Sequence, residues 1–277
     1  MESAARLVSV TDGAGVTEAA STPLVEMRTI NVSFGGVRAV QDASIQLFGG
    51  EVIGLVGHNG AGKSTLMRVL SGAHAADSGE ILIDGRAATI KNPRDAKTYA
   101  IETIYQNLAL ADNLDAPGNL FLGREMTTKI GQLDDSSMES ETRKVMQRLN
   151  PNFRRFHQPV VSLSGGQRQA IAIARAVYFN AKILIMDEPM AALGPAETAQ
   201  VHSLVHQLKS DGIGIFLISH DIHDVFNLSD RISVMYQGRI IETVARDSVT
   251  TEDVLGMIIV GKKPEQLTRQ ERAELHP

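Results

Sequence analysis

The chain contains no cysteine and no tryptophan, and only 4% of its 277 residues are aromatic. Without cysteine, disulfide scaffolds and thiolate metal sites are excluded, and the composition suits a reducing compartment. The scarcity of aromatic side chains argues against a surface that stacks on bases or sugar rings. The formal net charge of −5 predicts no nucleic-acid partner, because nucleic-acid-binding domains usually carry a basic face.

Long apolar runs are also missing from the sequence. No stretch approaches the roughly 18 consecutive apolar residues that a membrane-spanning helix requires. The first residues, Met1 to Arg6, lack the basic cluster and apolar run of a secretory signal. We therefore expect a protein that is soluble when expressed alone, with any membrane role supplied through a partner.

Hydrophobic residues make up 43% of the chain, which is close to the average for globular proteins. Three apolar runs show no alternation, at Val52–Val56, Ile183–Met186 and Ile213–Ile218. Such runs are typical of a parallel sheet that is covered on both faces. Each is followed by polar residues, and open α/β sheets bind ligands at the carboxyl ends of their strands.

The remaining pattern divides the chain into four parts. Residues 1–23 are small and polar without a period, which predicts a disordered leader. Residues 24–261 carry the strand and helix patterns of one domain, within which 107–165 are mostly helical in pattern and predict an inserted subdomain. Residues 262–277 form a charged tail.

A phosphate-loop pattern follows the first apolar run: Gly57, four residues, then Gly62-Lys63-Ser64. Glycines let the backbone adopt left-handed conformations and approach phosphates without a Cβ in the way. Lys63 is expected to reach the β and γ phosphates, and Ser64 to give an oxygen to Mg²⁺. The helical pattern after the loop would point amide groups at the anion.

Two carboxylates end the second apolar run. Asp187 is placed to hold the magnesium shell, directly or through water, as the second acidic element of such sites does. Glu188 follows and projects differently, so it can polarise the attacking water as a general base. Beside a phosphate loop, these acids predict a hydrolytic site rather than a solvated strand end.

The segment Leu163-Ser164-Gly165-Gly166-Gln167 opens another helical run. Ser164 can act as an N-cap, and the glycines are expected to expose the helix terminus to an anion. With the two preceding motifs, this segment resembles the signature of the ATP-binding cassette (ABC) ATPases, over about residues 24–260. The resemblance implies an α/β fold: a P-loop NTPase core with a mostly parallel sheet, an N-terminal antiparallel β subdomain and an inserted helical subdomain.

The resemblance also implies roles for residues outside the three motifs. Phe34 resembles the aromatic residue that stacks on adenine, and Gln106 the glutamine that contacts magnesium beside the helical subdomain. His220 resembles the histidine that contacts the γ-phosphate and positions the water. ATP and Mg²⁺ are the implied ligands. The implied nucleotide contacts are Phe34, Gly57, Asn59, Gly60, Ala61, Gly62, Lys63, Ser64, Thr65 and Gln106. Metal ligands are expected at Ser64, Gln106 and Asp187, and catalytic roles at Lys63, Glu188 and His220.

The resemblance further implies that two copies of the chain are needed to form each catalytic site. The two copies would bind two ATP molecules, each between one copy's phosphate loop and the other copy's Ser164, Gly165, Gly166 and Gln167. The segments after Gln106 resemble monosaccharide importers of the ribose and fructose type. The implied partners are integral-membrane permeases and, indirectly, an extracytoplasmic substrate-binding protein, with this chain on the cytoplasmic face of the plasma membrane. The alternatives are an amino-acid importer and a soluble cluster-assembly ATPase.

The sequence departs from the family pattern after the strand acids. Residues 189–194 read Pro-Met-Ala-Ala-Leu-Gly, so that Gly194 stands where an aspartate is usual. Some sugar-importer cassettes resemble this chain in having Ala-Ala-Leu-Gly at this turn. Because Asp187, Glu188 and His220 are all present, we predict a competent ATPase.

Overall fold

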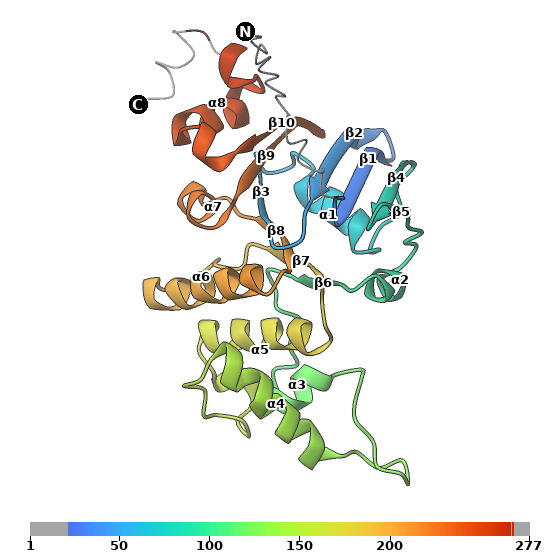
Figure 1. Cartoon of the computed structure of the whole chain (residues 1–277), viewed down its shortest axis with the longest axis vertical. Coiled ribbons are helices and arrows are strands. Elements are labelled where there is room, and N and C mark those ends of the chain that lie inside the picture. The colour runs from blue at the N-terminus through green and yellow to red at the C-terminus, as the bar shows by residue number, and fades with distance from the viewer. Residues whose placement is uncertain (1–21, 267, 269–277) are drawn as a thin grey trace, which may run out of the picture.

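The computed structural model describes residues 22–266 and residue 268. The predicted leader lies outside the described residues except for its last two positions, and so does most of the predicted tail. Figure 1 shows the order of the elements along the chain. The strands are β1 (Val25–Phe34), β2 (Val37–Leu47), β3 (Val52–Val56), β4 (Ser78–Ile83), β5 (Arg86–Ala87), β6 (Ile101–Ile104), β7 (Ile183–Asp187), β8 (Gly214–Ile218), β9 (Arg231–Tyr236) and β10 (Arg239–Ala245). The helices are α1 (Lys63–Leu70), α2 (Pro93–Thr98), α3 (Ala116–Phe121), α4 (Asp135–Leu149), α5 (Gly165–Tyr178), α6 (Pro195–Ser210), α7 (Ile222–Leu228) and α8 (Thr251–Val260), with 3₁₀ turns at Val160–Ser162, Arg246–Ser248 and Pro264–Gln266.

A six-stranded sheet forms the centre, in the order β10-β9-β3-β8-β7-β6. Its neighbouring strands run parallel, except for the antiparallel pair β9 and β10 at one edge. All five residues of β3 and of β8 are buried, and so are the first four of β7. This burial on both faces explains why their sequences show apolar runs without alternation, and it confirms the predicted parallel sheet.

A second sheet, in the order β2-β1-β4-β5, is antiparallel throughout. Its apolar face and helix α1 share one hydrophobic cluster with the neighbouring face of the central sheet, including Met27, Leu47, Leu66 and Phe216. This sheet is the predicted N-terminal antiparallel subdomain. Packing it over α1 fixes the helix that follows the phosphate loop.

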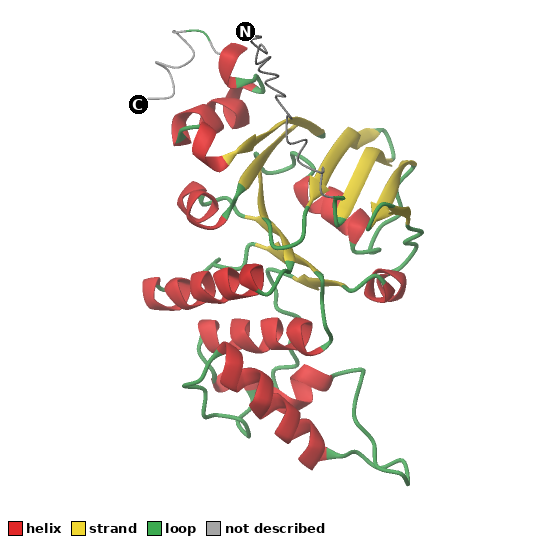
Figure 2. Cartoon of the chain, in the orientation of Figure 1, coloured by secondary structure: helices red, strands yellow, loops and turns green. Residues whose placement is uncertain are grey.

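Helices and the loops that join them form the far end of the molecule, where α3, α4 and α5 lie together (Figures 1 and 2). Both α3 and α4 fall inside the predicted range of 107–165, and α5, which packs against both, begins at its last residue. Phe121, Phe153 and Met146 are buried in the cluster that joins these helices to α6 and the central sheet. The helical part therefore shares a continuous core with the sheet.

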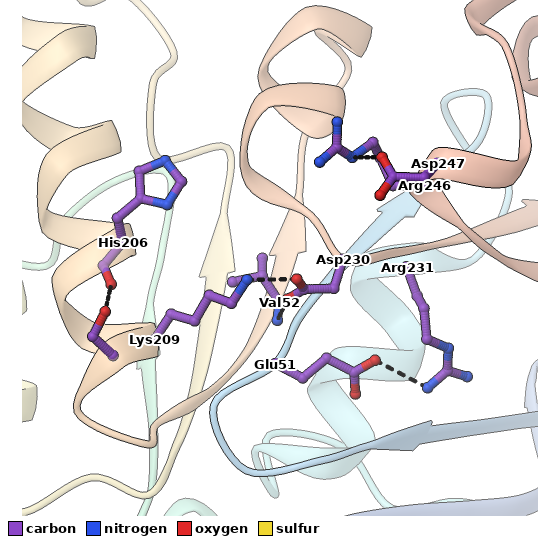
Figure 3. Close-up of polar contacts among 9 residues, drawn as sticks. Glu51, Val52, His206, Lys209, Asp230, Arg231, Arg246 and Asp247 are labelled. Carbon is purple, nitrogen blue, oxygen red and sulfur yellow. Dashed lines mark hydrogen bonds and ion pairs between the residues drawn. The ribbon is translucent and has the colours of Figure 1, made fainter.

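Ion pairs and hydrogen bonds tie the amino ends of the central strands together (Figure 3). The buried amide of Val52, at the start of β3, donates to Asp230 Oδ2 at 2.9 Å, and Lys209 from the end of α6 contacts Asp230 Oδ1. Arg231, which begins β9, pairs with Glu51 at 3.1 Å. These contacts lie at the opposite edge of the sheet from the strand ends that carry the predicted site.

Among the described residues, none of the helices combines the length and the apolar composition needed to cross a membrane.

Candidate nucleotide-binding and catalytic site

The order of the parallel strands places four of the predicted motifs side by side. The phosphate loop follows β3, His220 comes two residues after β8, Asp187 ends β7, and Gln106 comes two residues after β6. Since β3, β8, β7 and β6 are consecutive neighbours in one parallel sheet, their carboxyl ends meet at the same edge. Residues far apart in the sequence thus form one row along this edge.

The phosphate loop has a backbone that only glycine fits at two positions. Gly57 has a φ of 151°, and a Cβ there would lie 2.1 Å from the carbonyl oxygen of Met235. Gly62 has a φ of 105°, and its Cβ would lie 2.5 Å from the carbonyl oxygen of Ala39. The loop is therefore pressed against β2 and β9 and enters α1 directly, as the pattern of small residues predicts.

Lys63 is buried at the start of α1, and its ammonium is held inside the loop. Its Nζ donates to the carbonyl oxygens of Gly57 at 2.7 Å and His58 at 3.0 Å. Burial lowers the pKa of Lys63, while the nearby charges of Glu188 and Asp187 act in the opposite direction. A phosphate bound in the loop would place a negative charge beside the Lys63 ammonium and so offset the cost of burying it.

Ser64 and Asp187 meet across the ends of β3 and β7. The Ser64 side chain lies near the Asp187 carboxyl group and interacts with it in the direction that lowers the pKa of Asp187. Burial, followed by the neighbouring charge of Glu188, raises the pKa of Asp187. A half-buried carboxylate beside a hydroxyl oxygen matches the hard oxygen ligands that Mg²⁺ prefers.

Glu188 and His220 form the closest polar pair of the site. Glu188 Oε2 lies 2.6 Å from His220 Nδ1 and 3.4 Å from the His220 backbone nitrogen. Glu188 has a φ of 52°, in the left-handed region that non-glycine residues rarely adopt, and its own amide donates to the Ile218 carbonyl at 2.9 Å. From this turn the side chain of Glu188 reaches His220.

Gln106 lies beside Glu188, with which it lines a cavity of about 270 Å³. Gly165 and Gln169 from α5 line the same cavity. Gln169 is almost fully buried, and its side-chain nitrogen has no hydrogen-bond partner among the described residues. Sequence reasoning did not single out Gln169, because a glutamine in a helix has no distinguishing local pattern.

The segment Ser164–Gln167 forms a capping box at the start of α5. The Gln167 amide donates to Ser164 Oγ at 3.3 Å, and the Ser164 amide donates to the Gln167 side-chain oxygen at 3.2 Å. The predicted N-cap role of Ser164 is thus confirmed. Gly166 also donates its amide to Glu197 Oε1 at 3.2 Å, so a carboxylate of the same chain already lies at the helix terminus that we expected to be exposed.

Phe34 ends β1 with an exposed ring, 48% accessible, at the turn into β2. Its ring centroid lies 4.6 Å from that of His74, a contact between distant segments that no local pattern predicts. An exposed aromatic ring at this position leaves a face available for stacking, consistent with the expected adenine contact. Among the described residues, no hydrogen bond or ion pair joins Phe34 or the segment Ser164–Gln167 to the phosphate loop.

Comparison with curated proteins gives extended similarity to sugar importers. The chain is 41% identical over 248 residues to the xylose/arabinose import ATP-binding protein of Sulfolobus acidocaldarius, covering 87% of this chain and 98% of that protein. It is 40% identical over 252 residues to a ribose import ATP-binding protein of Escherichia coli O157:H7, covering 91% of this chain and 49% of that protein. The chain therefore spans about half the length of the ribose relative.

Solved structures with the same fold are ATP-binding cassettes of ABC transporters. One, in its ADP conformation, superposes with a TM-score of 0.76 at 27% identity, covering 86% of this chain and 97% of that chain. Another, free of nucleotide, gives a TM-score of 0.71 at 28% identity, covering 80% of this chain and 91% of that chain.

The loop after β3, with carboxylates at the end of β7 and a histidine after β8, defines a P-loop nucleoside triphosphatase. The family described as ABC transporter matches residues 40–191. The chain belongs to the ABC transporter family.

Proposed function

We propose that the chain is the ATP-hydrolysing subunit of an ABC importer for a monosaccharide. The observation that carries the proposal is the contact between Glu188 and His220 beside the buried Lys63, because it unites a water-activating pair with a phosphate site. The similarity to proteins named for the import of xylose, arabinose and ribose supports a pentose or related sugar as the transported substrate.

Nucleotide binding begins with the phosphate loop and Phe34. The amides of Gly60, Gly62 and the first turn of α1 would hold the phosphates, and adenine would stack on the exposed ring of Phe34. Lys63 would exchange its two loop carbonyls for phosphate oxygens, a change that adds an opposite charge to a buried cation. Asn59, Ala61 and Thr65 would complete the contacts of the loop.

The oxygen donors at the end of β7 fit a magnesium ion. Ser64 and Asp187 are already in contact, and Gln106 follows the neighbouring strand β6. When bound, Mg²⁺ would neutralise charge on the β and γ phosphates during transfer. Asp187, whose pKa burial raises, would gain the countercharge that keeps it ionised.

Hydrolysis would rest on Glu188 and His220. Glu188 would orient and polarise a water molecule for attack on the γ-phosphate, and His220 would hold the carboxylate and the phosphate in register. The strained backbone at Glu188 fixes the direction of its side chain before the substrate arrives. Preorganisation of this kind avoids reorganisation at the moment of reaction.

A second copy would complete each site. Ser164 to Gln167 lie on the helical part and make no polar contact with the phosphate loop of their own chain within the described range, so they would serve the nucleotide of the partner copy. ATP would then hold the dimer together, and hydrolysis would release it. A transporter can couple this change between the ATP-bound dimer and the separated copies to mechanical work.

A groove between α2, β6 and α5 offers a place for a permease. Lys97, Tyr105, Leu108 and Arg175 are among the residues that line it, and Tyr105 is 40% exposed. The groove continues from the strand end that carries Gln106. Movement of a docked permease helix would therefore be transmitted to the residues at the carboxyl ends of β3, β8, β7 and β6. The chain would thereby sit peripherally on the cytoplasmic face of the membrane, while an extracytoplasmic binding protein delivers the sugar to the permease.

Growth of a deletion strain on a panel of single carbon sources tests the proposed substrate. Loss of growth on one pentose or hexose, restored by the wild-type chain but not by Lys63→Ala, is the expected result. Co-purification of the chain with a permease in the membrane fraction tests the coupling. Unaltered growth on every sugar, with recovery of the chain only with soluble partners, would contradict the proposal.

A further inference from the structure

The carboxylate of Glu197 lies on the helix terminus that the proposed dimer needs. Glu197 is in the first turn of α6, and its two oxygens accept from different helices. Oε1 accepts from the Gly166 amide at 3.2 Å, and Oε2 accepts from the Gly194 amide at 3.2 Å. The hydrogen bond from Gly166 foremost, then the one from Gly194 and an interaction with the nearby Ser164 side chain, lower the pKa of Glu197.

The two glycines of the segment permit this arrangement. A Cβ on Gly165 would lie 2.6 Å from a methyl carbon of Leu193, and a Cβ on Gly166 would lie 3.2 Å from the Cβ of Glu197. The start of α5 is thus packed closely against the turn that connects Glu188 to α6. In the separate chain, the space beside these glycines is filled by Leu193 of that turn and by side chains of α6.

An incoming phosphate would need the same donors. Gly166 has one amide hydrogen, which it donates to Glu197, and the Ser164 side chain lies near enough to the same carboxylate to interact with it. A phosphate and a carboxylate cannot share these donors without two anions coming into contact. Glu197 can release Gly166 and still cap α6 through Gly194, so it has a second position that keeps one of its bonds.

We propose that Glu197 is an internal anion that occupies the donors of Ser164 and Gly166 in the separate chain and leaves them when ATP on a second copy arrives. The inference rests on the proposed dimer and adds a residue that opposes it. Glu197 thereby competes with the phosphate: it weakens association of the two copies, and it binds the donors again once the phosphate departs. We call this competing role of Glu197 the gate. The γ-phosphate held by the second copy must therefore bind these donors more tightly than the Glu197 carboxylate does.

The test measures the dissociation constant of the ATP-bound dimer by sedimentation velocity, in full-length chains that carry Glu188→Gln to prevent hydrolysis. Glu197→Gln keeps the shape of the side chain and removes its charge. Because hydrogen bonds to charged groups are the stronger ones, we expect this substitution to lower the dissociation constant by about tenfold. Glu197→Ala, which lacks both the charge and the amide, is expected to change it in the same direction.

Three controls separate the gate from other effects. Glu141→Gln removes a charge from the exposed face of α4, where Glu141 pairs with Lys144, and it should leave the dissociation constant unchanged. The affinity of the monomer for ATP should be the same in every variant, since Glu197 makes no contact with the phosphate loop in the described part of the chain. Ser164→Ala should weaken the dimer.

The outcomes distinguish the two proposals. If Ser164→Ala weakens the dimer while Glu197→Gln leaves it unchanged or weakens it, the gate is overturned and the dimer stands. If Glu141→Gln strengthens the dimer as much as Glu197→Gln does, general charge repulsion replaces the gate. If the Glu188→Gln chain stays monomeric in ATP and Mg²⁺, or Ser164→Ala has no effect, the proposed dimer fails and the gate fails with it.

Discussion

Glu188 Oε2 and His220 Nδ1 are 2.6 Å apart, which joins the carboxyl ends of β7 and β8 by a side-chain contact. Glu188 is largely buried and His220 is exposed, with side-chain accessibilities of 15% and 70%. The histidine therefore holds the carboxylate from the open side of the site, where ATP and water would enter. Because of this contact we propose that the two residues act in hydrolysis as one unit rather than as two separate groups.

Replacing Glu188 by glutamine separates hydrolysis from binding. Glutamine keeps the size of the side chain but removes the base, so we expect the rate of ATP hydrolysis to fall by about 10²-fold or more. ATP should still hold the two copies together, because the phosphate loop and the segment at Ser164 are unchanged. Hydrolysis assays and light scattering measure the two effects, and a monomer at saturating ATP and Mg²⁺ would contradict the assignment.

Replacing Lys63 by alanine removes the buried cation of the phosphate loop. We expect ATP binding to be lost, or turnover to fall by about 10²-fold or more, because Lys63 supplies the positive charge inside the loop, where its ammonium contacts two loop carbonyls. Lys91→Ala, at an exposed position before α2, is the matched control and should leave both unchanged. Equal ATPase activity in the two variants would refute the site.

The raised pKa of Asp187 predicts a pH dependence of stability in the nucleotide-free chain. Between the pKa of about 3.9 in the unfolded chain and the higher pKa in the folded chain, the folded state binds more protons than the unfolded state. The free energy of unfolding therefore falls as the pH rises through this window. Asp187→Asn removes that dependence. We expect the variant to gain free energy of unfolding relative to the wild type as the pH rises through this window, and to keep the gain at neutral pH.

Denaturant unfolding at a series of pH values checks this prediction, and a melting temperature a few degrees above the wild type at neutral pH should accompany it. The same variant is expected to lose hydrolysis, because Asp187 is a proposed magnesium ligand. A stability difference that does not change with pH, or one that favours the wild type as the pH rises, would contradict the assigned direction.

Replacing Asp230 tests a contribution to stability at the amino ends of the central strands, away from the proposed catalytic residues. Asp230→Ala leaves the amide of Val52 without its acceptor at a fully buried position, which costs about 1–3 kcal/mol of the free energy of unfolding. Asp247→Ala is the matched control, since Asp247 is exposed and contacts only its neighbour Arg246 in Figure 3. Denaturant unfolding should show a loss for the first variant alone, and equal losses would contradict the role of Asp230.

The sequence predicted the strands and the motifs because both depend on neighbours in the chain. The apolar run at Val52–Val56 and the glycines around Lys63 are local patterns, and each lies where predicted. The sequence could not place Glu197, because its contact with Gly166 joins helices that are separate in the chain. It also gave the glycines of α5 only a phosphate-binding role, whereas the structure shows that they also allow α6 to approach.

The sequence by itself determined the class of chemistry: a phosphate loop, two strand-end carboxylates and a helix cap are set by residue type and spacing, which act through local backbone geometry and hydrogen bonding. The tertiary structure alone decided which of these groups touch. Burial of apolar strands fixed the order β3-β8-β7-β6. That order brought His220 to Glu188, and close packing of α6 on α5 brought Glu197 to Gly166, because the hydrophobic core is assembled from distant segments that no local pattern records.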